Sequence, residues 1–261
     1  QSQGKAITYK EIREAILRGD IDPKWLDDWI QDYSKLVKKY MQPAWEKAID
    51  AGVTSKAQKY PAFYFNPMAE GIRDWAANRA AEFVTNVSTT QIEGLRAVVQ
   101  RAAAMEGMSV DELSRVIRPM VGLTKQQSNT VMNYYQKLRE NGVSPKRARE
   151  SAIRDASRRH RERAYSIART ELATAYNSGA HEATKQAQAK GYMGRTVKVW
   201  CAADDERMCP YCGDMDGKEI DIGEEFEGIS SSWSTRLHPP AHPGCRCAAL
   251  YVEKEPPEKN M

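Results

Sequence analysis

The five cysteines of the chain all lie in its last quarter. Cys209 and Cys212 form a C-x2-C pair, and the later segment HPGCRC adds His242, Cys245 and Cys247. Thiolates and imidazoles are the usual ligands of tetrahedral zinc, and a two-residue spacer lets both thiolates of a tight turn face one ion. An odd, clustered set of cysteines also fits metal binding better than a secreted disulfide framework. The sequence therefore predicts a zinc site.

This set contains one more donor than a tetrahedral site needs. The ligands that we predict are Cys209, Cys212, His242 and Cys247, with Cys245 as the alternative to Cys247. His238 and Cys201 are weaker candidates for the same role. Without metal, the cysteines would instead form a reduced, buried group. Because thiolates offered to a metal must escape oxidation, we expect folding in a reducing, cytoplasmic environment.

A catalytic zinc ion would differ from a structural one in its surroundings. It would leave one position open to water and would need a general base, for which Asp205 and Glu206 are the nearest candidates. The spacing around His181-Glu182 does not match the pattern of zinc deaminases. Because the chain has enough donors to close the site, we predict a structural zinc and no enzymatic activity.

Up to about residue 191, Ala-, Leu-, Arg- and Glu-rich runs alternate with short segments that contain glycine or proline, a pattern typical of helices. Ser109 with Glu112, and Thr124 with Gln127, match the capping box that begins a helix. The later runs are short and β-prone. The predicted helices span roughly 8–18, 23–50, 67–105, 110–117, 125–140 and 145–189, and the predicted strands span 196–202, 218–222 and 247–253.

These elements predict a mainly α protein with a small C-terminal, zinc-stabilised antiparallel β-module, an α+β architecture. Zinc has a physical reason there, because about sixty residues with few aliphatic side chains form only a marginal core. The segments that we predict are a helical region over 1–107, a second helical region with a long basic helix over 108–190, the β-module over 191–253 and a polar tail over 254–261.

Composition excludes several classes of protein. Hydrophobic residues make up 41% and charged residues 28% of the 261 residues, which argues against disorder and against collagen-like or repeat proteins. No apolar run approaches the roughly 18 residues of a membrane span, so no membrane partner is expected. The formal net charge is only +4, which is modest for a dedicated DNA-binding protein.

Positive charge is nevertheless concentrated on the predicted helix that begins at Pro145. Between residues 146 and 169 there are nine Lys or Arg against three Asp or Glu. At about 100° per residue, five arginines share an arc of roughly 80°. This arginine stripe consists of Arg147, Arg154, Arg158, Arg161 and Arg169. The stripe would contact phosphates of double-stranded DNA or a partner protein, unless Asp155 and Glu162 pair with it on a solvated face.

Two further features carry predictions. On the same helix, Glu171 projects into an apolar face of small residues, where a carboxylate needs a partner, so we predict a structural role for it.

Between residues 51 and 68, two prolines and several aromatic side chains predict an irregular connection. Its aromatic residues, Tyr60, Phe63, Tyr64 and Phe65, either pack on the neighbouring helices or form a docking loop for a partner.

The order of four motifs resembles that of phage minor head proteins of the head-morphogenesis, Mu F-like family. The similarity runs from about Gly122 to Leu250. The motifs are GLTKQQSNTVMNYYQKLRENGVS, IARTELATAYNSG, VKVWCAADDERMCPYCGDMDGK and HPPAHPGCRC. The resemblance carries a zinc-knuckle-like pattern onto the Cys/His set described above. It also matches Arg169, Thr170 and Glu171 of the helix motif, and Trp200 and Arg207.

The resemblance implies a virion component that is made in the host cytoplasm, is present in few copies and lies at the portal vertex or the capsid interior. Its implied partners are the portal protein, the major capsid protein or other virion proteins. Packaged DNA, or its delivery, stays open as a further contact. The main alternative is a zinc-containing nonspecific DNA-binding protein, and the third is a zinc hydrolase.

Overall fold

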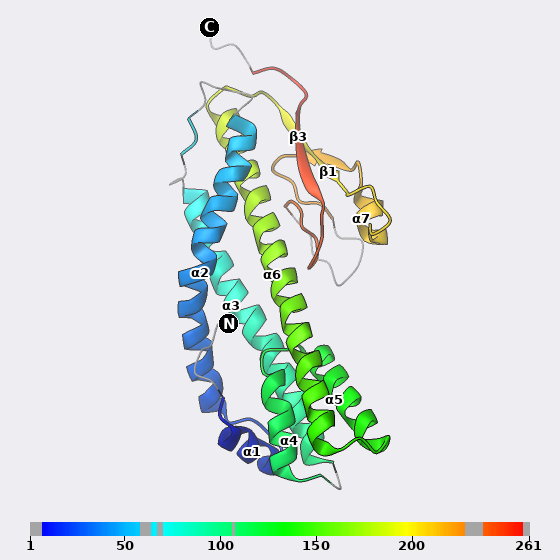
Figure 1. Ribbon diagram of the computed structural model, residues 1–261. Helices are drawn as coiled ribbons and strands as arrows, with labels where there is room; N and C mark the ends of the chain where they lie inside the picture. The colour runs from blue at the N-terminus through cyan, green and yellow to red at the C-terminus, as the bar shows by residue number, and fades with distance from the viewer. Residues whose placement is uncertain (1–6, 58–63, 67–69, 106–107, 228–236, 258–261) are drawn as a thin grey trace. The chain divides into compact units, whose positions relative to one another are not determined.

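The structure is a computed structural model that describes residues 7–57, 64–66, 70–105, 108–227 and 237–257. Within these ranges most residues are helical (Figure 1). The helices are α1 (Tyr9–Arg18), α2 (Pro23–Ala57), α3 (Glu70–Ala103), α4 (Val110–Ile117), the 3-10 helix η1 (Arg118–Met120), α5 (Lys125–Glu140), α6 (Pro145–Ala189) and α7 (Pro210–Met215). None of the described helices combines the length and the apolar character needed to cross a membrane.

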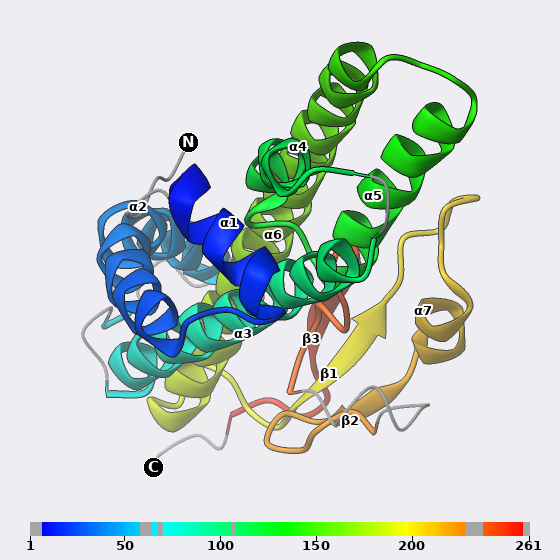
Figure 2. The ribbon, with the colours of Figure 1, turned by 90° about the horizontal axis from the view of Figure 1, so that it is seen from below.

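The strands follow α6 and form one antiparallel sheet in the order β2-β1-β3 (Figure 2). They are β1 (Thr196–Cys201), β2 (Glu219–Asp221) and β3 (Ala248–Glu253). Val197 of the central strand pairs with Asp221 on one side and with Val252 on the other. The predicted mainly α architecture with a small C-terminal antiparallel sheet is thereby confirmed.

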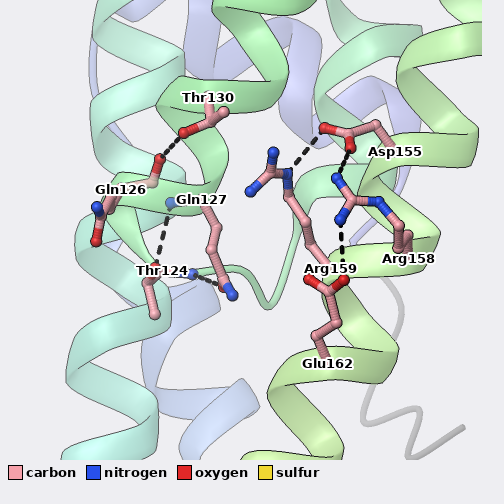
Figure 3. A network of polar contacts seen from close by, with 8 residues as sticks. All are labelled: Thr124, Gln126, Gln127, Thr130, Asp155, Arg158, Arg159 and Glu162. Atoms are coloured by element: carbon pink, nitrogen blue, oxygen red, sulfur yellow. Dashed lines mark hydrogen bonds and ion pairs between the residues drawn. The ribbon is translucent and has the colours of Figure 1, made fainter. Parts of the chain in front are cut away.

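Helix starts follow the predicted capping chemistry. Thr124 caps α5: its side chain accepts a hydrogen bond from the Gln127 amide, and the Gln127 side chain accepts one from the Thr124 amide (Figure 3). Ser109 accepts a hydrogen bond from the Glu112 amide at the start of α4, which is half of the predicted capping box. The Glu112 carboxylate accepts hydrogen bonds from Tyr135 and Arg139 instead. These side chains satisfy amides that have no partner inside the helix. The predicted boundaries of both helices are therefore confirmed.

The described chain divides into two compact units that are discontinuous in sequence. Unit 1 comprises Gln1–Tyr40 and Arg79–Tyr165, and unit 2 comprises Met41–Asn78 and Ser166–Met261. The core of unit 1 is apolar and draws on α1, α3, α4, α5 and α6. Its fully buried side chains include Val98, Ile117, Leu123, Val131 and Met132. Burial of such side chains stabilises a fold by about 1.5–3 kcal/mol each, so unit 1 has a conventional hydrophobic core.

Unit 2 packs its helices closely through glycine. A Cβ atom on Gly179 of α6 would lie 2.4 Å from the Ile49 carbonyl oxygen of α2, and one on Gly52 would lie 2.1 Å from the Tyr176 carbonyl oxygen. No larger residue allows these backbones to approach so closely without a shift. This glycine packing was not predicted. Of the small residues expected on the apolar face of α6, Ala156 and Ala175 are buried, whereas Ala164 and Ala168 are exposed.

Three elements differ from the sequence-based prediction. Helix α2 continues to Ala57 rather than ending near residue 50, because Gly52 packs on α6 instead of interrupting the helix. The C-x2-C segment was expected to form only a tight turn, but it begins the short helix α7. The 3-10 helix η1 was not expected. Tertiary packing thus overrides a local helix-breaking signal at Gly52.

Candidate metal centre

The C-x2-C pair lies at the start of α7 in unit 2. Cys209 is the N-cap, with φ −78° and ψ 152°, and Pro210 occupies the first helical position. The Cys212 amide donates a hydrogen bond to the Cys209 sulfur over 3.4 Å. This cap turns both sulfur atoms toward the same side, so the local sequence alone builds this half of the site.

The second half comes from the segment before β3. The Nε2 atom of His242 lies 3.1 Å from the Cys209 sulfur and 3.2 Å from the Cys212 sulfur. The Cys212 sulfur also lies 3.8 Å from the Cys245 sulfur. The donor atoms form two groups, each with all atoms within 4.8 Å: Cys209, Cys212 and His242, and Cys212, Cys245 and Cys247. Cys212 belongs to both, so the structure brings together all five predicted donors.

The arrangement fits a tetrahedral ion with sulfur and nitrogen ligands. With Zn–S bonds of about 2.3 Å, two thiolates of a tetrahedral site stand about 3.8 Å apart, close to the observed separation of Cys212 and Cys245. The Nδ1 atom of His242 lies 3.0 Å from the Pro243 carbonyl oxygen, to which it can donate, and this leaves Nε2 as the ligand atom. The cluster can therefore hold a metal ion.

Three donors of the cluster are buried, whereas Cys209 and His242 are half-buried. Cys212, Cys245 and Cys247 are 5%, 2% and 5% exposed. Trp200 and Phe226 pack edge to face beside them, with ring centroids 5.1 Å apart. A buried set of thiols that lies against aromatic side chains matches a closed structural site better than one open to substrate.

Protonation within the cluster is uneven. A hydrogen bond with Cys247 lowers the pKa of Cys245 to about 5, against the opposing effect of burial. Burial raises the pKa of Cys212 to about 12. Since a metal ion binds thiolates, loading the cluster would release protons from the thiols that keep them, and metal affinity would fall with decreasing pH.

Arg246, between two of the cysteines, was not predicted to have a role. Its guanidinium group forms a two-pronged ion pair with Asp205, whose carboxylate also accepts a hydrogen bond from the Arg207 amide over 2.9 Å. The pairing with Arg246 holds the pKa of Asp205 well below its usual range. Asp205 thus joins the loop before α7 to the segment that carries the second half of the cluster, and its carboxylate is occupied.

His238 and Cys201, the weaker candidate ligands, belong to neither donor group. The Nε2 atom of His238 lies 3.0 Å from the Ser178 hydroxyl of α6, and the Cys201 sulfur is 3.9 Å from the Val199 carbonyl oxygen. Thr170 and Asn177 of α6 likewise hydrogen-bond backbone amides of the ligand-bearing segment. Sequence reasoning missed these helix residues, although their polar side chains at helical spacing in IARTELATAYNSG were an available signal.

The arginine stripe is partly neutralised. In unit 1, Arg158 pairs with Asp155 at 2.6 Å and with Glu162 at 2.9 Å (Figure 3). Arg147, Arg154 and Arg161 are exposed and form no ion pair with any residue that the structure describes. The fifth stripe residue, Arg169, is half-buried and belongs to unit 2. The positive surface within unit 1 therefore consists of three arginines spaced seven residues apart.

The remaining predicted residues lie in unit 2. Glu171 is buried, at 4% exposure, as its position on the helix indicated. The segment with Tyr60, Phe63, Tyr64 and Phe65 is here called the aromatic loop. In this loop Tyr64 is 76% exposed whereas Phe65 is buried, so of these two residues Tyr64 offers its ring to a partner. Tyr60 and Phe63 lie outside the described residues. The Tyr64 carbonyl accepts a hydrogen bond from the Lys190 ammonium group over 2.8 Å. This bond joins the loop to the residue that directly follows α6.

Fold and site together define a helical protein whose C-terminal module can hold a metal ion. A family model described as Phage Mu protein F like protein matches residues 94–250, more than half of the chain. The chain therefore belongs to the phage Mu protein F-like family and is a phage head morphogenesis protein. Comparison with curated proteins and with solved structures gave no match.

Proposed function

We propose that this chain is a non-enzymatic minor head protein that binds the portal protein, the major capsid protein or another virion protein at the portal vertex or the inner capsid surface. Family membership supports assembly as its task. The observation that carries the molecular part of the proposal is the Cys/His cluster, whose five donors could close a structural metal site. In this role the metal fixes a β-module beside a long helix, so that the surfaces for partners keep their shape.

The metal is zinc, held in one tetrahedral site. Cys209, Cys212 and His242 supply three ligands, and Cys247 or Cys245 supplies the fourth. Elemental analysis of the purified chain should find one zinc per chain, and chelation should remove a thermal transition that belongs to the C-terminal module. A chain without metal, with the same melting curve before and after chelation, would contradict the structural zinc site.

The aromatic loop is the proposed contact for virion proteins. Co-expression with the portal protein of the same phage, followed by size-exclusion chromatography, should give a complex. Tyr64→Ala should weaken that complex without a change in melting temperature, because the side chain is exposed. The matched control is Tyr192→Ala, a tyrosine that is less exposed and lies outside the loop. Equal binding by both variants and the unchanged chain would move the contact elsewhere.

A second function, nonspecific binding to packaged DNA, is favoured by Arg147, Arg154 and Arg161. Phosphate binding would weaken steeply with salt, because each neutralised phosphate releases counterions. The triple variant Arg147→Gln, Arg154→Gln, Arg161→Gln should flatten the slope of log affinity against log salt by about three units. Docking through an aromatic side chain would show no such slope.

A zinc hydrolase is the least supported alternative. Five donors suffice to close the coordination sphere, and the carboxylate of Asp205, a candidate base, is paired with Arg246. Hydrolysis that requires zinc and is lost in Asp205→Asn or Glu206→Gln would reverse this ranking.

A further inference from the structure

The second half of the metal cluster lies on residues 238–249, here called the ligand strap. The strap is fastened to α6 by three hydrogen bonds, all within unit 2. They join Ser178 to His238 (3.0 Å), the Gly244 amide to the Thr170 hydroxyl (2.9 Å) and the Ala249 amide to the Asn177 side-chain oxygen (3.1 Å). These bonds lie before, between and after the metal-binding residues of the strap.

The three helix residues share one face of α6. Positions 177 and 178 lie seven and eight residues after position 170, which places all three within an arc of about 100° around the helix axis. Asn177 and Ser178 are buried, at 3% and 9% exposure. Buried polar side chains are retained where they have partners, and here each has one on the strap. α6 therefore presents a polar face to the metal-binding segment.

The bond to Thr170 acts where the strap turns. Gly244 has φ 76°, in the left-handed region that favours glycine, and the Cys245 amide donates a hydrogen bond to the His242 carbonyl over 3.0 Å. This turn brings a histidine ligand and a cysteine ligand together. Since the Thr170 hydroxyl accepts the hydrogen bond of the Gly244 amide, α6 fixes the orientation of the turn.

The two halves of the cluster thus differ in what holds them. Cys209 and Cys212 are arranged by the local cap of α7, whereas the strap depends on side chains of α6. Tight metal binding needs both halves in position, so contacts that hold the strap in place favour binding. Groups that orient metal ligands typically change metal affinity by 10–100-fold when they are removed.

We propose that Thr170, Asn177 and Ser178 are positioning residues of the metal centre, and that docking of the strap on α6 is coupled to metal binding. This inference rests on the proposed metal site. The coupling is reciprocal: if the helix contacts favour metal binding, metal binding favours the contacts to the same extent. The metal state of the cluster is therefore coupled to the contacts between the strap and α6.

The experiment compares variants of the full chain. Thr170→Val keeps the shape of the side chain and removes the acceptor for the Gly244 amide, and Asn177→Ala removes the acceptor for the Ala249 amide. The matched control is Thr174→Val. Thr174 lies on the same helix, and its hydroxyl donates to the Thr170 carbonyl over 2.8 Å. Thr170→Ser, which restores a hydroxyl, is the rescue variant.

Zinc affinity is measured by competition with a chromophoric chelator, and the ligand field by the absorption of bound cobalt(II). We expect Thr170→Val and Asn177→Ala to bind zinc about 10–100-fold more weakly, with unchanged stoichiometry. Thr174→Val and Thr170→Ser should bind like the unchanged chain. Hydrogen exchange of the β1 and β3 amides checks that the variants are folded. In the unchanged chain, chelation should accelerate exchange of the Gly244 and Ala249 amides.

The outcomes separate the two proposals. If the unchanged chain binds no metal, the proposed zinc site fails, and the positioning role fails with it. If the unchanged chain binds zinc but Thr170→Val and Asn177→Ala bind it equally well with the same cobalt spectrum, only the positioning role is wrong. A loss of affinity in Thr174→Val as large as that in Thr170→Val would also overturn it, because the effect would then belong to the helix as a whole.

Discussion

Different interactions stabilise the helical core of unit 1 and the C-terminal module of unit 2. Unit 1 buries aliphatic side chains from five helices, among them Ile117 and Val131, which are fully buried. The C-terminal module has a three-stranded sheet, an edge-to-face aromatic pair and a cluster of cysteines. Unit 1 has an extensive apolar core, whereas the proposed metal would supply part of the stability that the small module lacks. The same chain should therefore respond to metal removal in one part only.

The largest effect should follow from Cys212→Ser, because Cys212 belongs to both donor groups. We expect loss of zinc and unfolding of the module, since structural zinc contributes on the order of 10 kcal/mol in small zinc domains. Hydrogen exchange should show fast β1 and β3 amides, with slow exchange retained in α4 and α5. Cys201→Ser is the control and should keep its zinc. Retention of metal by Cys212→Ser would remove the contrast between the two parts.

The next effect tests the apolar side of the comparison. Ile117→Ala leaves a cavity in the core of unit 1 and should cost about 2–5 kcal/mol of unfolding free energy. Denaturant titration gives this value, and zinc content should stay at the unchanged level. A parallel loss of zinc would mean that the two parts unfold together.

A smaller effect concerns pH and unit 2. Burial, then the charges of His238, Lys198 and Lys185, lowers the pKa of His181 to about 3, against about 6.5 in an unfolded chain. Between these values the unfolded state binds a proton that the folded state does not, so stability is present above pH 6.5 and is lost as pH falls.

His181→Phe removes this titration. Relative to the unchanged chain, it should flatten the decline of unit 2 stability between pH 6.5 and 5 by about 2 kcal/mol. Metal loss in acid affects both proteins, so the difference between their melting curves isolates His181. Parallel curves over this range would contradict the prediction.

The smallest effect belongs to the surface of unit 1. Arg158→Ala removes the two ion pairs of an exposed arginine on α6 and should change the unfolding free energy by less than about 1 kcal/mol. Thermal melting at low and high salt provides the measurement. A larger loss at both salt concentrations would show that the stripe supports the fold and does not serve only as a surface for partners.

Local signals in the sequence account for much of the fold. Capping residues such as Thr124 and Ser109 fix helix starts because they satisfy backbone amides within the next turn. The end of α2 could not be predicted, since Gly52 acts as a helix residue only when α6 lies against it. Arg246 was missed for a similar reason: its partner Asp205 is forty-one positions away in sequence.

The sequence by itself determined the longer helices, the three strands and the residue types of the metal cluster, because capping, periodicity and C-x2-C spacing act over a few neighbouring residues. Tertiary structure decided which segments form each compact unit and which side chains face the ligand strap. Thr170 and Gly244 are seventy-four positions apart, and only folding brings the hydroxyl of one to the amide of the other. Contacts of that range depend on the packing of whole elements, which no local pattern encodes.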